Sequence, residues 1–260
     1  VIDYDTNKTL IEVNADTLNY PASLTKIMTL YIVFDYIKNE KISWETKMKV
    51  SKIAASRSPS KLYLEPGSTI AVKDAVMALI IKSANDVATV ISEHISGSEK
   101  HFAKLMTNYA KNLGMHNTTF KNASGLPNRS QLTTVRDISI LSHSLIKNFP
   151  NEYKLFSKEK FIWNGKTYKT HNKLMKTYKG ADGIKTGYIY DAGFQLAFSA
   201  KRKDRRLIGV VFGGDSSKQR NKTVQLLMNK GFEKTKINIA KKNEKKEFFG
   251  DYQIVVGTFK

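Results

Sequence analysis

Apolar residues in the first part of the chain recur mainly at helical spacing. The stretch from Ser23 to Lys38 is apolar on nearly every face, which predicts a helix buried in the core. Four further helices are predicted at Val72 to Lys82, Asp86 to Ile95, Ser98 to Leu113 and Thr134 to Phe149. Before them, Val1 to Tyr4 and Thr9 to Val13 flank a polar turn, so we expect a β-hairpin at the start of the chain.

From Phe161 onward the pattern changes to that of strands. Strands are predicted at Phe161 to Trp163, Lys166 to His171, Gly183 to Tyr188, Phe194 to Ala200 and Arg206 to Phe212. The last two carry near-continuous apolar runs, which is typical of strands in the middle of a sheet covered on both faces. A closing helix is predicted from Ser216 to Phe232. The pattern therefore indicates an α/β (α+β) fold with one main domain, residues 1–232.

The segments beyond Phe232 have a different character. Residues 233–250 are rich in charge without apolar periodicity, so we expect a linker. Residues 251–260 alternate like a strand, and we expect them to be the truncated start of a second domain. Because the first residues already resemble a strand, we also expect any targeting signal to lie outside this sequence.

Composition narrows the functional classes. The 260 residues contain 43 Lys and Arg against 23 Asp and Glu, a net charge of +20. Such an excess favours anionic surroundings, which leaves nucleic acid, acidic lipid headgroups and cell-envelope polymers open. The chain has no cysteine, which excludes disulfides, a thiol nucleophile and Cys-ligated metals. The histidines form no metal-binding motif, so we expect neither a metal nor another cofactor.

Ser23 and Lys26 are the first candidates for chemistry. Their i, i+3 spacing places both side chains on one face at the start of the buried helix. A lysine can activate a serine only when its amine is neutral, and burial favours the neutral form. The Ser-x-x-Lys spacing alone is weak evidence, because Ser58/Lys61, Ser144/Lys147 and Ser157/Lys160 repeat it.

Two more motifs strengthen this interpretation. Ser83 and Asn85 lie between two predicted helices, where they are also plausible caps of an interhelical turn. Lys185, Thr186 and Gly187 lie on a predicted strand, where a glycine allows a ligand backbone to approach closely. The three motifs follow one another at separations of 60 and 102 residues.

In this order the motifs resemble those of the low-molecular-mass penicillin-binding proteins that are serine-type D-Ala-D-Ala carboxypeptidases. The resemblance covers Val1 to about Phe232 and includes Pro21 to Lys26, Asn122 to Leu126 and Asp182 to Gly187. It implies a β-lactamase/transpeptidase-like fold, with an antiparallel sheet of about five strands flanked by helices and a helical subdomain. Residues 252–260 resemble the first strand of the sporulation-related repeat domain, which binds peptidoglycan.

The resemblance also implies a role for each site residue. Ser23 would be the nucleophile, Lys26 its base, and Ser83 a proton relay to the leaving group. Asn85 would hold the peptide amide, and Lys185 would place positive charge beside Ser83. Thr186 and Arg220 would bind the terminal carboxylate, while the backbone N–H groups of Ser23 and Tyr188 would form the oxyanion hole. Gly187 would line the strand, and Asn172 would lie near the site.

The expected function is removal of the terminal D-Ala from peptidoglycan pentapeptide stems, with acylation and inhibition by penicillin and other β-lactams. The alternatives are an endopeptidase, a transpeptidase or a β-lactamase acting through the same acyl-enzyme, or a non-catalytic cell-wall-binding module. The Glu-x-x-Leu-Asn context of fast β-lactamases is absent. Aromatic residues are not interleaved with Lys and Arg, so we expect no nucleic-acid partner. We expect an exported protein of a bacterial periplasm or cell envelope, peripheral to the membrane or cell wall.

Overall fold

A four-stranded antiparallel sheet forms one layer of the molecule. The computed structural model describes the backbone of residues 1–249 and the side chains of residues 1–235. The strands are β1 (Ile2–Asp3), β6 (Ala181–Ile189), β7 (Gly193–Arg202) and β8 (Arg205–Gly214), in the order β1-β8-β7-β6. The two strands with continuous apolar runs, β7 and β8, occupy the middle of the sheet, as predicted.

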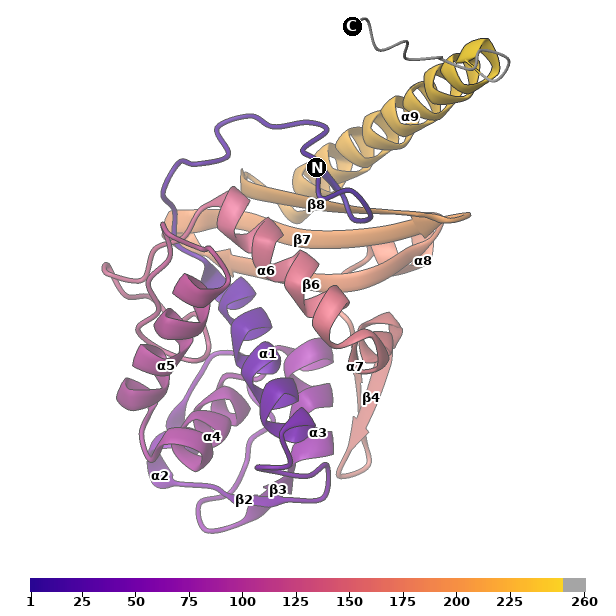
Figure 1. The fold of residues 1–260 in the computed structure, drawn as a ribbon. Helices are drawn as coiled ribbons and strands as arrows, with labels where there is room; N and C mark the ends of the chain where they lie inside the picture. Colours follow the sequence, from indigo (N-terminus) through magenta and orange to yellow (C-terminus); the bar gives the residue numbers. More distant parts are fainter. Residues whose placement is uncertain (250–260) are drawn as a thin grey trace, which may run out of the picture.

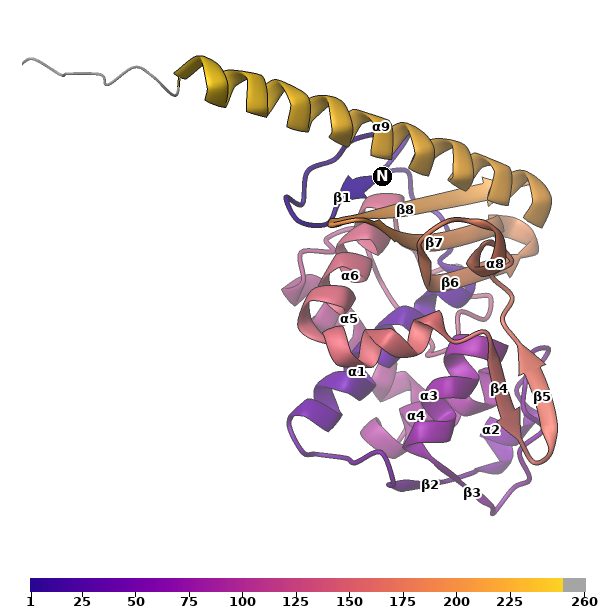
Figure 2. The ribbon, with the colours of Figure 1, turned by 90° about the vertical axis from the view of Figure 1, so that its right-hand side faces the viewer.

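Helices cover both faces of this sheet (Figures 1 and 2). On one face lie α9 (Ser217–Phe249) and the short α8 (Leu174–Thr177), and α6 (Val135–Asn148) packs on the other. Side chains of alternate strand residues point to opposite faces. Phe198 and Leu207 therefore pack toward Met228 of α9, while their neighbours Ala197 and Ile208 join the main core. The expected α/β architecture is confirmed.

A mostly helical subdomain lies below the sheet in Figure 1. It is built from η1 (Ala22–Leu24), α1 (Thr25–Lys38), α2 (Lys52–Ser56), α3 (Val72–Met77), η2 (Ala78–Lys82), α4 (Asn85–Ser96) and α5 (Glu99–Asn112), with a two-stranded ribbon of β2 (Lys47–Lys49) and β3 (Thr69–Ala71). Every residue of α1 from Thr25 to Phe34 is buried, which explains its lack of a polar face. The predicted buried helix is thus the centre of the main core, and its first turn lies below the edge of the sheet.

The remaining elements are connections. Between α6 and the sheet lie α7 (Pro150–Tyr153), η3 (Lys154–Ser157) and the hairpin of β4 (Lys160–Trp163) and β5 (Lys166–Lys169), while η4 (Tyr190–Ala192) joins β6 to β7. The hairpin pairs Trp163 with Lys166 around Asn164 and Gly165, both of which have positive φ. This is the turn chemistry that Asn-Gly predicts. The β4–β5 hairpin packs against η2, beside the helical subdomain (Figure 2).

The start of the chain differs from the predicted hairpin. Thr9 forms only an isolated bridge with Ile2, and no strand covers residues 9–13. The returning segment instead runs beside α6, where Arg136 forms ion pairs with Glu12 and Asp16 at 2.9 and 2.7 Å. The described sheet therefore has four strands where about five were expected.

The last helix is longer than its apolar pattern predicted. Instead of ending at Phe232, α9 continues to Phe249 through the stretch expected to be a linker. Lys and Glu are strong helix formers, so a charged segment can extend a helix without an apolar face. The division into domains at residues 232 and 250 stays a prediction, and the expected strand at 251–260 lies outside the described residues. No described helix is both long enough and apolar enough to cross a membrane.

Candidate active site

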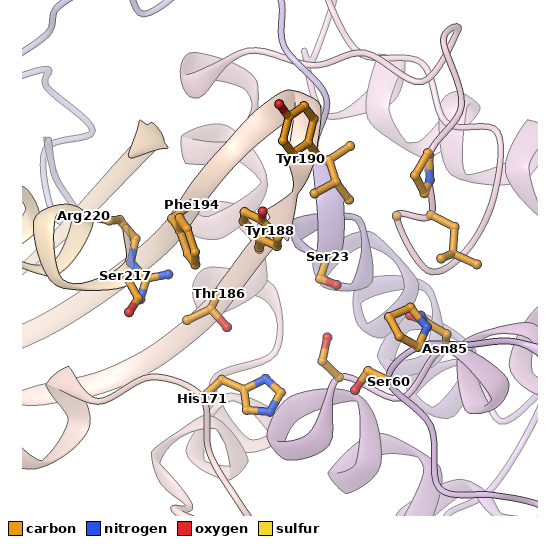
Figure 3. Close-up of a pocket in the computed structure, with 17 residues that line it drawn as sticks. Ser23, Ser60, Asn85, His171, Thr186, Tyr188, Tyr190, Phe194, Ser217 and Arg220 are labelled. Atoms are coloured by element: carbon orange, nitrogen blue, oxygen red, sulfur yellow. The ribbon is translucent and has the colours of Figure 1, made fainter. Parts of the chain in front are cut away.

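The three motifs meet in a cleft of about 550 Å³ between β6 and the helical subdomain (Figure 3). Seven of the predicted site residues line it, namely Ser23, Ser83, Asn85, Thr186, Gly187, Tyr188 and Arg220. They come from η1, the turn after η2, the start of α4, strand β6 and the first turn of α9. Residues far apart in the sequence thus converge on one site.

The backbones of two glycines pack closely against the turn that carries Ser23. Ala22, directly before it, has a φ of 45°, which non-glycine residues rarely adopt. Gly125 has a φ of 87°, and a Cβ at this position would overlap the carbonyl oxygen of Ala22. On the other side, a Cβ on Gly187 of β6 would lie 3.3 Å from the backbone nitrogen of Ser23. The two glycines let their backbones close on the turn.

Lys26 lies one helical turn below Ser23 and is fully buried. Its Nζ is 3.2 Å from Ser23 Oγ, 2.8 Å from Asn85 Oδ1 and 2.5 Å from the carbonyl oxygen of Ser124. The amide orientation of Asn85 is fixed because its Nδ2 donates to the carbonyl oxygen of Ser58 at 3.0 Å. A neutral amine has two hydrogens for the two carbonyl oxygens, which leaves its lone pair for the Ser23 hydroxyl.

Burial holds the pKa of Lys26 well below its ordinary value. The charge of Lys185 lowers it further, while the carboxylates of Asp86 and Glu99 oppose the shift. Burial and the Lys185 charge therefore favour the neutral amine, whose lone pair can accept the hydrogen of the Ser23 hydroxyl. The structure thus brings Ser23 and Lys26 together as a hydrogen-bonded pair, and their roles as nucleophile and base stay a prediction.

Ser83 ends η2 with a φ of 62°, in the left-handed region. Its Oγ is buried and has no hydrogen-bond partner among the described residues. A buried hydroxyl without a partner is costly, and such groups concentrate at functional sites. Because Ser83 lines the cleft, a bound ligand can supply the missing partner.

Lys185 is 3% exposed and is not among the residues that line the cleft. Its Nζ donates to the carbonyl oxygen of Thr186 at 3.1 Å. Burial, reinforced by the charge of Arg220, lowers the pKa of Lys185 to about 7. Its influence on the site is electrostatic, since its charge lowers the pKa values of Lys26 and His171.

Arg220 brings a buried cation to the end of the cleft beside Thr186 (Figure 3). One Nη donates to the carbonyl oxygen of Gln195 at 2.9 Å, and Nε and the other Nη donate to Asn221 Oδ1. Among the described residues, Arg220 forms no ion pair with a carboxylate. A guanidinium held in place without a counterion fits an anionic ligand group.

Tyr188 follows Gly187 at the exposed end of β6. Its side chain is half exposed and packs on Phe194, with ring centroids 4.3 Å apart. The aromatic wall continues to Tyr190, while Leu126 and Pro127 also line the cleft. The cleft thus combines an apolar wall with the polar groups of the three motifs.

The structure places Asn172 beside the cleft, outside its lining. Its Nδ2 donates to the carbonyl oxygen of Gly183, and its Oδ1 accepts from the backbone nitrogen of Leu174, both at 3.2 Å. These bonds fix the segment before α8 to β6. The preceding residue, His171, lines the cleft instead, and sequence reasoning missed it. Burial, with the charges of Lys185, Lys82 and Lys26, lowers the pKa of His171 to about 4, so its ring is neutral at pH 7.

Possible metal ligands do not gather at the site. The described residues contain no group of three or more His, Asp or Glu side chains placed to hold a metal ion.

Known proteins share both the sequence and the fold. The family model described as D-alanyl-D-alanine carboxypeptidase matches residues 1–216. The D-alanyl-D-alanine carboxypeptidase DacF of Bacillus subtilis is 37% identical over 240 residues, covering 89% of this chain and 61% of that protein. The chain therefore spans about three fifths of the length of this relative.

Solved structures agree with this match. The D-alanyl-D-alanine carboxypeptidase DacD from Francisella tularensis superposes with a TM-score of 0.86 at 33% identity, over 88% of this chain and 68% of that one. Penicillin-binding protein D2 from Listeria monocytogenes, in its ampicillin-bound form, gives a TM-score of 0.82 at 33% identity, over 89% and 95% of the two chains. The family model covers most of the chain, and the motifs meet in one cleft, so this protein belongs to the D-alanyl-D-alanine carboxypeptidase family.

Proposed function

We propose that this chain is a serine D-Ala-D-Ala carboxypeptidase that removes the terminal D-Ala from peptidoglycan pentapeptide stems. The observation that carries the proposal is the buried Lys26 amine. Its two carbonyl partners accept its hydrogens, and its third neighbour, at 3.2 Å, is the hydroxyl of Ser23. That arrangement prepares a serine to act as a nucleophile.

The reaction begins when Ser23 Oγ attacks the carbonyl carbon of the penultimate D-Ala and Lys26 accepts the hydroxyl proton. The negative charge on the carbonyl oxygen is stabilised by the backbone N–H groups of Ser23 and Tyr188. The C–N bond then breaks, and the departing D-Ala nitrogen receives a proton through Ser83. The remaining peptide is held as an ester of Ser23, which water hydrolyses to give the tetrapeptide and free enzyme.

Recognition of a free C-terminus follows from Arg220 and Thr186. The carboxylate of the leaving D-Ala would accept hydrogen bonds from these two residues at the end of the cleft. Asn85 would bind the peptide amide, and Gly187 leaves room for the peptide beside β6. A substrate with a blocked terminal carboxylate would leave the Arg220 charge buried without a partner, so cleavage should be restricted to free ends.

Other fates of the same acyl-enzyme are weaker candidates. Transfer to an amine would make the protein a transpeptidase or endopeptidase, and fast hydrolysis of a penicillin adduct would make it a β-lactamase. The relatives' names favour the carboxypeptidase, and the ampicillin-bound Listeria structure supports binding of β-lactams by this chain. We also propose that the protein acts outside the cytoplasm, in the cell envelope, where its substrate lies.

Product analysis tests this proposal. Incubation with a pentapeptide stem should release free D-Ala and leave a tetrapeptide, while Ser23→Ala should abolish release. Ser157→Ala is the matched control, because Ser157 belongs to another Ser-x-x-Lys pair but is exposed. A cross-linked product, or no D-Ala from the unmodified protein, would rule out the carboxypeptidase.

A further inference from the structure

Two tyrosines and three lysines form a cluster beside the active-site cleft. Lys61 Nζ lies 5.2 Å from the ring centroid of Tyr63, and Lys82 Nζ lies 5.8 Å from that of Tyr168. Lys166 Nζ joins the two rings, at 6.0 and 5.6 Å from their centroids. We call these five residues the tyrosine–lysine cluster. Contacts of this kind hold ammonium groups in place without neutralising them.

The three ammonium groups have no acidic partner. Among the described residues, none of them forms an ion pair, and the single hydrogen bond of Lys61 is a 3.4 Å contact with the carbonyl oxygen of Ala55. Three like charges gathered on two rings repel one another. An anionic ligand would relieve this repulsion.

Tyr63 is displayed in a strained conformation. It has a φ of 63° and is 66% exposed, although aromatic side chains usually gain stability from burial. The buried carboxylate of Asp86 fixes the turn by accepting the backbone N–H groups of Leu62 at 2.9 Å and Leu64 at 3.3 Å. These bonds hold the backbone on both sides of Tyr63 while its ring stays exposed, and local strain of this kind is a common mark of a functional position.

The cluster is tied to the catalytic residues. The backbone nitrogen of Asn85 donates to the carbonyl oxygen of Ser60 at 2.7 Å, and Ser60 Oγ donates to the carbonyl oxygen of Lys82 at 2.8 Å. Ser60 lines the cleft and directly precedes Lys61, while Lys82 directly precedes Ser83. Figure 3 shows Ser60 beside Asn85 at the edge of the cleft. Lys61 and Lys82 are thus each the direct neighbour of a residue that lines the cleft, so the cluster adjoins it.

We propose that the tyrosine–lysine cluster binds carboxylates of the peptidoglycan peptides outside the terminal D-Ala-D-Ala. The inference rests on the proposed function, since it names a second contact for the same substrate. The occupant is an acidic peptide, because three unpaired lysines complement carboxylates and the cluster adjoins the site where the peptide is cleaved. Neutral or amidated peptides would gain nothing from it.

Two synthetic pentapeptides ending in D-Ala-D-Ala test the inference. One carries free carboxylates at its second and third residues, and the other carries carboxamides there. The protein should release D-Ala from the acidic peptide with a kcat/KM about three- to tenfold higher, a preference that added salt reduces. In the triple variant Lys61→Gln, Lys82→Gln, Lys166→Gln this preference should disappear. An unchanged preference in the variant would overturn the inference.

The control removes the same charge elsewhere. Lys100, Lys104 and Lys111 are exposed on α5, and replacing all three by Gln should leave the preference intact. If the control loses the preference as well, net charge is responsible and the cluster is not the site. If the triple variant folds, fluorescent penicillin should label it normally. If it does not fold, the single variant Lys166→Gln takes its place in the comparison of the two peptides. Failure of the unmodified protein to release D-Ala from either peptide would instead refute the proposed function itself.

Discussion

Two buried lysines, Lys26 and Lys185, distinguish this site at the scale of single residues. Burial lowers both pKa values, and the charge of Lys185 lowers that of Lys26 further. A lysine that loses its proton on burial reduces the stability of the fold, because the unfolded chain binds that proton more tightly. Burial of these two lysines therefore lowers the stability of the fold and favours a neutral amine on Lys26.

This cost predicts how stability changes with pH. The pKa of Lys185 is about 7 in the fold, and its ordinary value is 10.5. Between these values the unfolded chain binds a proton that the folded chain lacks, so stability rises with pH across this window, by up to about 1.4 kcal/mol per pH unit for one group. Denaturant unfolding at several pH values should show that Lys185→Met lowers this slope. Lys201→Met, at an exposed position on β7, should keep it. Identical slopes for Lys185→Met and the unmodified protein would contradict the assigned cause.

Most of the candidate site residues could be predicted from the sequence, but the contacts that they make in the fold could not. The spacing of Ser23 and Lys26 predicted their hydrogen bond, since i, i+3 neighbours share a helical face. Nothing in the sequence indicates that the Ser124 carbonyl oxygen accepts from Lys26, because that contact joins residues 98 positions apart. His171 was missed for a similar reason, since only the fold brings it into the cleft.

At the scale of elements, the turn before α1 is the most constrained part of the site. It lies between Gly125 and strand β6, and neither backbone leaves space for a side chain there. The position of Ser23 against β6 depends on this close packing. A small change in one neighbouring loop should therefore disturb catalysis without touching any reactive group.

Gly125→Ala tests this dependence. The new methyl group would overlap the carbonyl oxygen of Ala22, so the turn must move and acylation by penicillin should slow by at least tenfold, as measured by stopped-flow mixing. Gly114→Ala is the matched control, because Gly114 also has a φ of 87° but has open space around it. It should cost about 1 kcal/mol of stability and leave acylation unchanged. Equal acylation rates in the two variants would show that the contact does not position Ser23.

The elements themselves were predicted unevenly. Helices with a clear apolar face and the two central strands agree closely with the pattern, since burial sets both. The first hairpin was wrong in its second strand, since Thr9 forms only an isolated bridge with Ile2 and the following residues contact Arg136 of α6. The end of α9 was wrong because helix propensity, without any apolar periodicity, continues the helix.

At the scale of the whole molecule, part of the net charge of +20 is concentrated in and beside the cleft. Arg220 and Lys185 bring positive charge to the site, and the tyrosine–lysine cluster adds three more cations beside it. The composition alone left nucleic acid, lipid headgroups and envelope polymers open as partners. The position of these cations around the cleft that contains Ser23 and Lys26 supports the proposed partner, an anionic peptidoglycan peptide.

Reaction with a fluorescent penicillin, followed by mass spectrometry of the digested protein, shows directly whether Ser23 is the nucleophile. We expect one stable adduct per chain, located on Ser23 and absent from Ser23→Ala. The adduct should persist, because the Glu-x-x-Leu-Asn context of fast β-lactamases is absent. An unlabelled protein, or an adduct that remains in Ser23→Ala, would contradict the assignment of Ser23 as the nucleophile.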